Sequence, residues 1–66
     1  MNIAVLGAGA WGTTLAILLT DNGHNVTLWE YNDAYSTLLE EKRENMTYLP
    51  GIPFPAGLKI SNNLQE

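Results

Sequence analysis

The chain has 66 residues, with no cysteine, one histidine, three basic and seven acidic residues, and a net charge of −4. The lack of cysteine excludes a disulfide scaffold, and the acidic balance argues against a nucleic-acid or anionic-membrane partner. No apolar run approaches the roughly 20 residues of a membrane span, and the N-terminus lacks the basic start of a signal peptide. We therefore expect a cytoplasmic protein.

An apolar run and a glycine-rich turn open the chain. We expect Asn2–Leu6 to form a strand, and because its apolar residues do not alternate with polar ones, a parallel strand buried on both faces. The following residues carry a GxGxxG pattern formed by Gly7, Gly9 and Gly12. A helix is predicted directly afterwards, from Ala10 to about Asp21, so the glycines lie at a strand-to-helix junction.

The spacing of apolar and capping residues predicts the next elements. Three leucines share one face of the first helix: Leu15, Leu18 and Leu19. Gly23 is placed to end that helix. A second strand is predicted at Asn25–Glu30, with Val26 and Leu28 on one face.

The second half of the chain is predicted to hold one helix, one loop and one strand. The helix covers about Asp33–Arg43, with Asp33 as its N-cap and two residues facing inward: Leu38 and Leu39. Residues 44–57 contain three prolines and two glycines, which predicts a loop. A strand follows at Leu58–Ile60. Asn63 and Glu66 then have the spacing of a capping box, which predicts a further helix and indicates a truncated chain.

This order of elements predicts an α/β fold, the β-α-β-α-β portion of a Rossmann-type parallel sheet with right-handed crossovers. Residues 1–66 would be the N-terminal part of a dinucleotide-binding domain. In the 3-2-1-4 strand order of that fold the first strand is central. Without a fourth strand it becomes an exposed apolar edge, so we expect the 66-residue chain to associate with itself.

Each glycine of the turn has its own predicted role. Gly7 permits the tight turn, Gly9 lets the backbone approach a pyrophosphate, and Gly12 lets the helix pack closely on the strand. The first amides of the helix, including those of Ala10 and Trp11, have no partners within it and would point at the phosphates. The alternative, that the glycines only shape a sharp turn, does not account for the acid that follows the second strand.

That acid is Glu30, at the carboxyl end of the second strand, where open α/β sheets bind their ligands. Its carboxylate would accept the adenosine ribose hydroxyls and repel a 2′-phosphate, which favours NAD over NADP. The alternative is a solvated strand-end acid. Tyr31 and Asn32 are candidates to flank the adenine, or are ordinary exposed turn residues. His24 is predicted at the opposite edge of the sheet from the cofactor, and the sequence holds no Ser/His/Asp, Cys/His or metal-ligand cluster, so we assign no catalytic residue and no metal site.

The chain resembles the N-terminus of the bacterial-type NAD(P)-dependent glycerol-3-phosphate dehydrogenases. Three stretches carry the resemblance over essentially the whole chain: Gly7–Ala16, Asn22–Trp29, and Arg43–Pro53 with its Glu-Asn-x-x-Tyr-Leu-Pro-Gly motif. The resemblance implies a cofactor domain followed by a helical substrate domain. It also implies the reversible reduction of dihydroxyacetone phosphate to sn-glycerol 3-phosphate for phospholipid synthesis.

The resemblance also suggests roles for single residues. Trp11 and Tyr48 match positions beside the cofactor, although Tyr48 taken alone would be read as a packing aromatic. Ala10 stands where the family often has serine. Tyr31 and Asn32 stand where many members have histidine or a basic residue linked to NADP use, which again favours NAD here.

Two other functions fit the glycine turn and its acid. One is a nucleotide-sensing regulatory module, which binds the ligand without chemistry. The long segment from Tyr48 to Pro55 argues against it, because such modules usually have short connections there. The other is a different two-domain NAD-dependent dehydrogenase, acting on a hydroxyacyl thioester or a sugar acid.

Overall fold

The computed structural model describes residues 2–63 as a parallel sheet, two helices and a small hairpin. The sheet has the strand order β1-β2-β5 and comprises β1 (Asn2–Leu6), β2 (Asn25–Trp29) and β5 (Lys59–Ser61). The helices are α1 (Ala10–Asp21) and α2 (Asp33–Lys42). The hairpin pairs β3 (Glu44–Asn45) with β4 (Leu49–Pro53). The predicted Rossmann-type α/β fold is confirmed.

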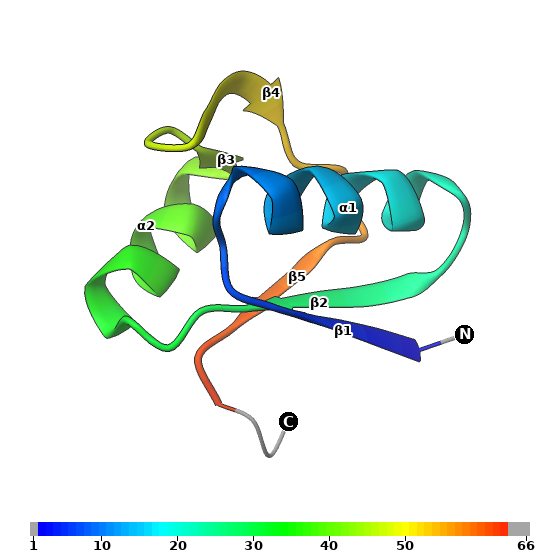
Figure 1. The fold of residues 1–66 in the computed structure, drawn as a ribbon, viewed down its shortest axis with the longest axis horizontal. Coiled ribbons are helices and arrows are strands. Elements are labelled where there is room, and N and C mark those ends of the chain that lie inside the picture. The colour runs from blue at the N-terminus through cyan, green and yellow to red at the C-terminus, as the bar shows by residue number, and fades with distance from the viewer. Residues whose placement is uncertain (1, 64–66) are drawn as a thin grey trace.

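Both helices lie on the same side of the sheet (Figure 1). Parallel strands are joined by right-handed crossovers, so two successive crossovers in one direction across the sheet put their helices on one face. The core lies between that face and the helices, and the hairpin segment closes it. Its buried apolar residues are Val5, Ala8, Ala16, Val26, Leu28, Leu39, Phe54 and Leu58. Among residues 2–63, neither helix combines the length and apolar character that crossing a membrane requires.

The prediction that β1 is buried on both faces is wrong for this chain. Val5 is buried, but Leu6 is 66% exposed and Ala4 is also exposed. Within residues 2–63, β1 pairs only with β2, and the helices cover one face of the sheet. The apolar run of β1 is typical of a strand that can be buried on both faces, but in this structure the helices cover only one face of the sheet.

Small residues, and not the predicted leucines, form the face that α1 buries against the sheet. Thr13 and Ala16 are fully buried, whereas Leu15 and Leu18 are 38% and 56% exposed. Leu19 packs against the core from its margin. Because α1 follows a tight turn, its first residues lie too close to β1 for large side chains. Its end agrees with the prediction: Gly23, at φ +91°, follows the C-cap.

The first turn of α2 is capped by Asn32, not by Asp33 as predicted. The Oδ1 atom of Asn32 accepts a hydrogen bond from the backbone N–H of Tyr35 at 2.9 Å, and Asp33 is the first helical residue. The N-cap was thus misplaced by one residue, since both side chains are good caps. Of the two leucines predicted to face inward, Leu39 is buried and Leu38 is 37% exposed.

The segment predicted to be a loop contains the β3–β4 hairpin and part of the core. Proline is tolerated in β4 because a two-stranded hairpin leaves many N–H groups outside the ladder. Phe54 and Leu58, which follow β4, are both buried. The strand boundaries also shift by one residue: β2 ends at Trp29, and β5 covers Lys59–Ser61. The predicted capping box extends to Glu66, outside the described residues.

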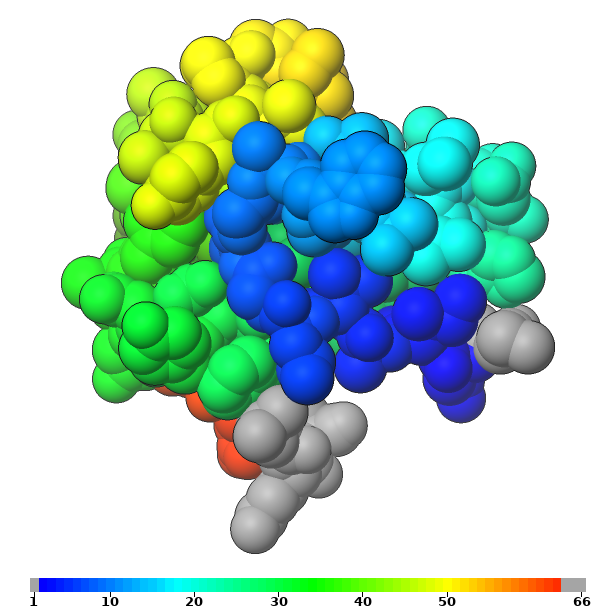
Figure 2. Space-filling view, viewed as in Figure 1, coloured from blue at the N-terminus to red at the C-terminus, as the bar shows by residue number. Residues whose placement is uncertain are grey.

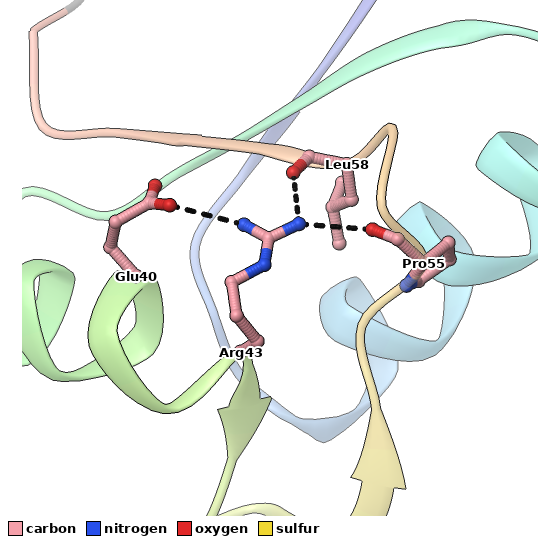
Figure 3. Close-up of polar contacts among 4 residues, drawn as sticks. All are labelled: Glu40, Arg43, Pro55 and Leu58. Atoms are coloured by element: carbon pink, nitrogen blue, oxygen red, sulfur yellow. Dashed lines mark hydrogen bonds and ion pairs between the residues drawn. The ribbon is translucent and has the colours of Figure 1, made fainter.

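Arg43 fastens this segment to the end of α2 (Figure 3). It is the C-cap of the helix with a left-handed φ of 52°. Its Nη2 atom donates to the carbonyl oxygens of Pro55 at 2.9 Å and Leu58 at 2.7 Å, and its guanidinium carbon lies 5.7 Å from the ring centre of Phe54. One side chain therefore holds the chain on both sides of the turn that leads into β5.

We expect Arg43→Met in the full-length protein to lower the free energy of unfolding by about 2 kcal/mol, because two carbonyls lose a charged donor. The control is Glu40→Gln. Glu40 pairs with Arg43 at 3.3 Å through a side chain that is 56% exposed, so its loss should change stability by less than about 0.5 kcal/mol. Denaturant unfolding measures both variants. If Arg43→Met lowered the free energy of unfolding no more than Glu40→Gln does, the two carbonyl contacts would contribute nothing to stability.

Candidate functional site

A pocket of about 500 Å³ lies at the carboxyl ends of β1 and β2. The predicted site residues that line it are Gly7, Gly9, Glu30, Tyr31, Asn32 and Tyr48. Ala8, Tyr35 and Thr47, which the sequence analysis did not single out, line it as well. Ala10, Trp11 and Gly12 are not among its lining residues. The structure thus gathers residues from two strand ends and the hairpin around one hollow.

The glycine turn forms one wall of this pocket and has two positions that only glycine suits. Gly7 has φ +91°, and its N–H continues the sheet ladder by donating to the carbonyl of Trp29 at 2.8 Å. A Cβ atom on Gly12 would lie 2.4 Å from the carbonyl oxygen of Gly7. The role predicted for Gly12, close packing of helix and strand, therefore has a direct steric basis.

Gly9, the N-cap of α1, is different because its surroundings are open. Its φ of −74° suits any residue, and a Cβ there would have no atom within 4 Å. Neither backbone conformation nor packing among the described residues requires glycine at this position. Gly9 also lines the pocket. A requirement for glycine here would have to come from something bound in the pocket.

The N-terminus of α1 is left uncapped by side chains in the described part of the chain, and its first turn holds no acidic residue. The helical ladder starts with the bond from the N–H of Thr13 to the carbonyl of Gly9 at 2.9 Å, so the preceding amides have no helical acceptor. In contrast, α2 has the Asn32 cap and Asp33 in its first turn. The two helix starts of one small fold thus differ: α1 has neither a side-chain cap nor an acid in its own first turn, and the carboxylate of Glu30 accepts from Ala8, ahead of the N-cap.

Glu30 is 8% exposed and holds the base of the pocket together. Its Oε1 atom accepts from the N–H of Ala8, and its Oε2 atom accepts from the N–H of Asn32, both at 3.1 Å. A carboxylate offers about four acceptor sites, so both oxygens keep room for a further donor. The ribose role predicted for Glu30 did not include this contact to the glycine turn, although the predicted strand order already placed the ends of β1 and β2 side by side.

Tyr31 and Asn32 differ in how free they are to meet a ligand. Tyr31 is 76% exposed, with its ring centroid 6.1 Å from that of Trp29. The side-chain oxygen of Asn32 is engaged as the cap of α2. Of this pair, Asn32 has one side-chain atom committed to the helix, whereas the Tyr31 side chain is largely exposed at the pocket.

Tyr48 reaches the pocket from the turn between β3 and β4. It is 55% exposed, and its ring meets that of Tyr35 edge to face at 6.2 Å and 88°. The turn before α1 and the hairpin segment border each other on the surface (Figure 2). Trp11, also assigned to the site, is 80% exposed at the start of α1.

Asn45 is the functional candidate that the sequence analysis missed. It is fully buried behind the pocket and donates to the carbonyl of Ala8 at 2.7 Å. Its place between Glu44 and Tyr48 in the motif was visible, but no propensity or spacing argument predicts a buried polar side chain inside a predicted loop.

His24 precedes β2 and so lies at the other end of that strand from Glu30. Residues 2–63 contain no group of three or more acidic or histidine side chains arranged to hold a metal ion.

Comparison with known proteins gives one consistent result. The family model described as NAD-dependent glycerol-3-phosphate dehydrogenase N-terminus matches residues 2–66. A glycerol-3-phosphate dehydrogenase (NAD(P)+) from Pelodictyon phaeoclathratiforme is 54% identical over 65 residues, which are 98% of this chain and 20% of that protein. One of the same name from Legionella pneumophila is 52% identical over 64 residues, which are 97% of this chain and 20% of that protein.

A solved structure agrees. The crystal structure of glycerol-3-phosphate dehydrogenase from Coxiella burnetii matches 97% of this chain and 20% of that one, with a TM-score of 0.92 and 42% identity. The chain thus spans about 20% of the length of the relatives it matches. Since the family model covers nearly all of its residues, the chain belongs to the NAD-dependent glycerol-3-phosphate dehydrogenase N-terminus family.

Proposed function

We propose that this chain is the dinucleotide-binding part of an NAD(P)-dependent glycerol-3-phosphate dehydrogenase. The observation that carries the proposal is the uncapped N-terminus of α1 beside the pocket that Glu30 and the glycine turn line. Unpaired amides and the positive end of a helix dipole suit a phosphate group. They also explain how a chain with net charge −4 binds a polyanion without a basic cluster.

In this proposal the chain's own residues bind and orient the cofactor. The first amides of α1 receive the pyrophosphate, and the absent side chain of Gly9 lets the backbone approach it. Glu30 accepts the ribose hydroxyls of the adenosine, and Tyr31 and Tyr48 border the nucleotide. Trp11 and Ala10 contribute backbone amides at the helix start. The bound nicotinamide supplies the hydride.

We further propose the reaction named for the relatives, with dihydroxyacetone phosphate and sn-glycerol 3-phosphate as substrate and product. The enzyme would work in the cytoplasm and supply phospholipid synthesis. Family membership supports this over a nucleotide-sensing module. The test is titration of the full-length protein with NADH and NADPH, followed by turnover with dihydroxyacetone phosphate. Binding of a dinucleotide followed by its oxidation is expected, and a protein that binds neither would refute the proposal.

We expect Glu30→Ser to weaken NADH binding and to narrow the gap between NADH and NADPH. Serine removes the ribose acceptor, the negative charge that opposes a 2′-phosphate, and the hold on the Ala8 amide. A change of about tenfold in the NADH/NADPH affinity ratio corresponds to about 1.4 kcal/mol.

The comparator is Glu30→Gln, which keeps an acceptor oxygen and nearly the same shape but loses the charge. If charge repulsion sets the preference, this variant shifts the ratio as the serine variant does, with less loss of NADH affinity. Fluorescence titration of each variant with both nucleotides measures the ratio. An unchanged ratio in both variants would remove Glu30 from the ribose site.

We also propose that the 66-residue chain by itself associates through β1. Among the described residues this strand pairs on one side only, and its Leu6 is 66% exposed. Exposed apolar edge strands pair with other chains, and a charged residue on the edge prevents this. Light scattering should therefore find oligomers of the native chain and a larger monomer fraction of Leu6→Lys. A monodisperse native monomer would contradict the prediction.

A further inference from the structure

Asn45 is the centre of a buried hydrogen-bond network behind the pocket. Its side chain is fully buried. The Nδ2 atom donates to the carbonyl of Ala8 and to Oγ1 of Thr13, both at 2.7 Å. The Oδ1 atom accepts from the hydroxyl of Tyr35 and from the backbone N–H of Tyr48, the latter at 3.3 Å. An amide side chain has two N–H donors and two acceptor lone pairs, and all of them are used here.

The partners of Asn45 come from four separate parts of the fold. Ala8 belongs to the glycine turn and Thr13 to the first turn of α1, while Tyr35 is on α2 and Tyr48 follows β3. Asn45 itself lies at the end of β3 and does not line the pocket. It therefore connects the wall that carries the tyrosines to the wall that carries the glycines.

Ala8 shows why this connection matters for the site. Its N–H donates to Oε1 of Glu30, and its carbonyl accepts from Asn45. Two side chains thus hold the residue between Gly7 and Gly9 from both ends. Because Ala8 is also 3% exposed, its peptide groups have little freedom to rotate. The direction of the amides that follow the turn is fixed before any ligand arrives.

We propose that Asn45 is a positioning residue for the dinucleotide, acting through Ala8 and Tyr48 without touching the ligand. It sets the glycine turn and the tyrosine wall at the separation that the cofactor fills, so binding does not have to order them. Neither aspartate nor leucine can replace it, because the first lacks the two donors and the second lacks every polar group. This inference rests on the proposed function.

The test uses the full-length protein and NADH titration by fluorescence. We expect Asn45→Ala to raise the Kd about tenfold, since the partners it leaves are buried polar groups. Thr13→Val is the milder variant: it removes one acceptor outside the pocket and reaches the site only through Asn45. It should raise the Kd about threefold. The double variant should bind no more weakly than Asn45→Ala, because both changes act on one network.

Val26→Ala is the matched control for a general loss of stability. Val26 is fully buried in β2 and lines no part of the pocket. It should lower the Tm and leave the Kd within about twofold of wild type, as expected for a change distant from the site. If its Kd rises as much as that of an Asn45 or Thr13 variant of equal Tm, affinity follows stability and the inference fails.

The remaining outcomes separate the two proposals. If wild type binds NADH and both network variants bind it equally well, the inference is overturned while the proposed function stands. If wild type binds neither NADH nor NADPH, the proposed function is refuted, and the inference with it. If Asn45→Ala does not fold, Thr13→Val and the Val26 control decide the matter.

Discussion

Gly12→Ala should unfold the region around the glycine turn, although alanine is the better helix former. In an exposed helix, alanine gains about 1 kcal/mol over glycine. Here the new Cβ would lie 2.4 Å from the carbonyl oxygen of Gly7 and 3.6 Å from Cγ1 of Val5. The closest atom is backbone, so the turn or the helix must move. Overpacking of this kind costs about 3 kcal/mol or more, which outweighs the gain in propensity.

Denaturant unfolding of the full-length protein, with hydrogen exchange across residues 5–16, measures this loss. The matched control is Gly57→Ala, whose Cβ would make an ordinary contact with Cγ2 of Thr20 at 3.6 Å. That variant should unfold like wild type. If Gly12→Ala were as stable as Gly57→Ala, helix and strand would not need the close approach.

Gly9→Ala should have the opposite effect, a folded protein that no longer binds the dinucleotide well. Its φ of −74° is open to alanine, and no atom lies within 4 Å of the added Cβ. The methyl group would project where the pyrophosphate approaches the backbone. A steric cost of about 2 kcal/mol corresponds to a Kd raised about 30-fold.

The pair of glycine variants separates folding from binding. Circular dichroism should show Gly9→Ala folded, with a Tm only slightly lowered because alanine is a poorer N-cap than glycine, and NADH titration should show the loss. Gly12→Ala should instead show a strongly lowered Tm. Wild-type affinity in Gly9→Ala would mean that no phosphate comes close to that residue and that the proposed ligand pose is wrong.

The order of the helices and of the sheet strands β1, β2 and β5 could be predicted because glycines and apolar spacing mark where each begins and ends. The bounds of α1 and β1 agree with the prediction, and β2 and α2 each end one residue earlier than expected. The face that each helix buries against the sheet was harder to predict. The apolar leucines of α1 suggested a large contact face, whereas its packing distance is set by Gly12 and the small residues after it. Hydrophobic spacing does not encode how closely a tight turn brings a helix to its strand.

Part of the pocket was predictable from the order of the strands. Gly7, Gly9 and Glu30 follow from the rule that ligands bind at the carboxyl ends of parallel strands. The hairpin and the role of Asn45 were not predictable. The prolines of this segment indicate a loop, and the pairing of the short strands β3 and β4 is set by tertiary contacts. Glu30 illustrates the limit: the predicted strand order placed it beside the glycine turn, but did not say which backbone N–H groups its carboxylate would bind.

The most direct test of the central claim is a crystal structure of the full-length protein with NAD bound. We predict the pyrophosphate over the N-terminus of α1, accepting hydrogen bonds from the first amides of that helix. The adenosine ribose should lie on the carboxylate of Glu30. A nucleotide bound elsewhere, with that helix start facing only water, would contradict the account.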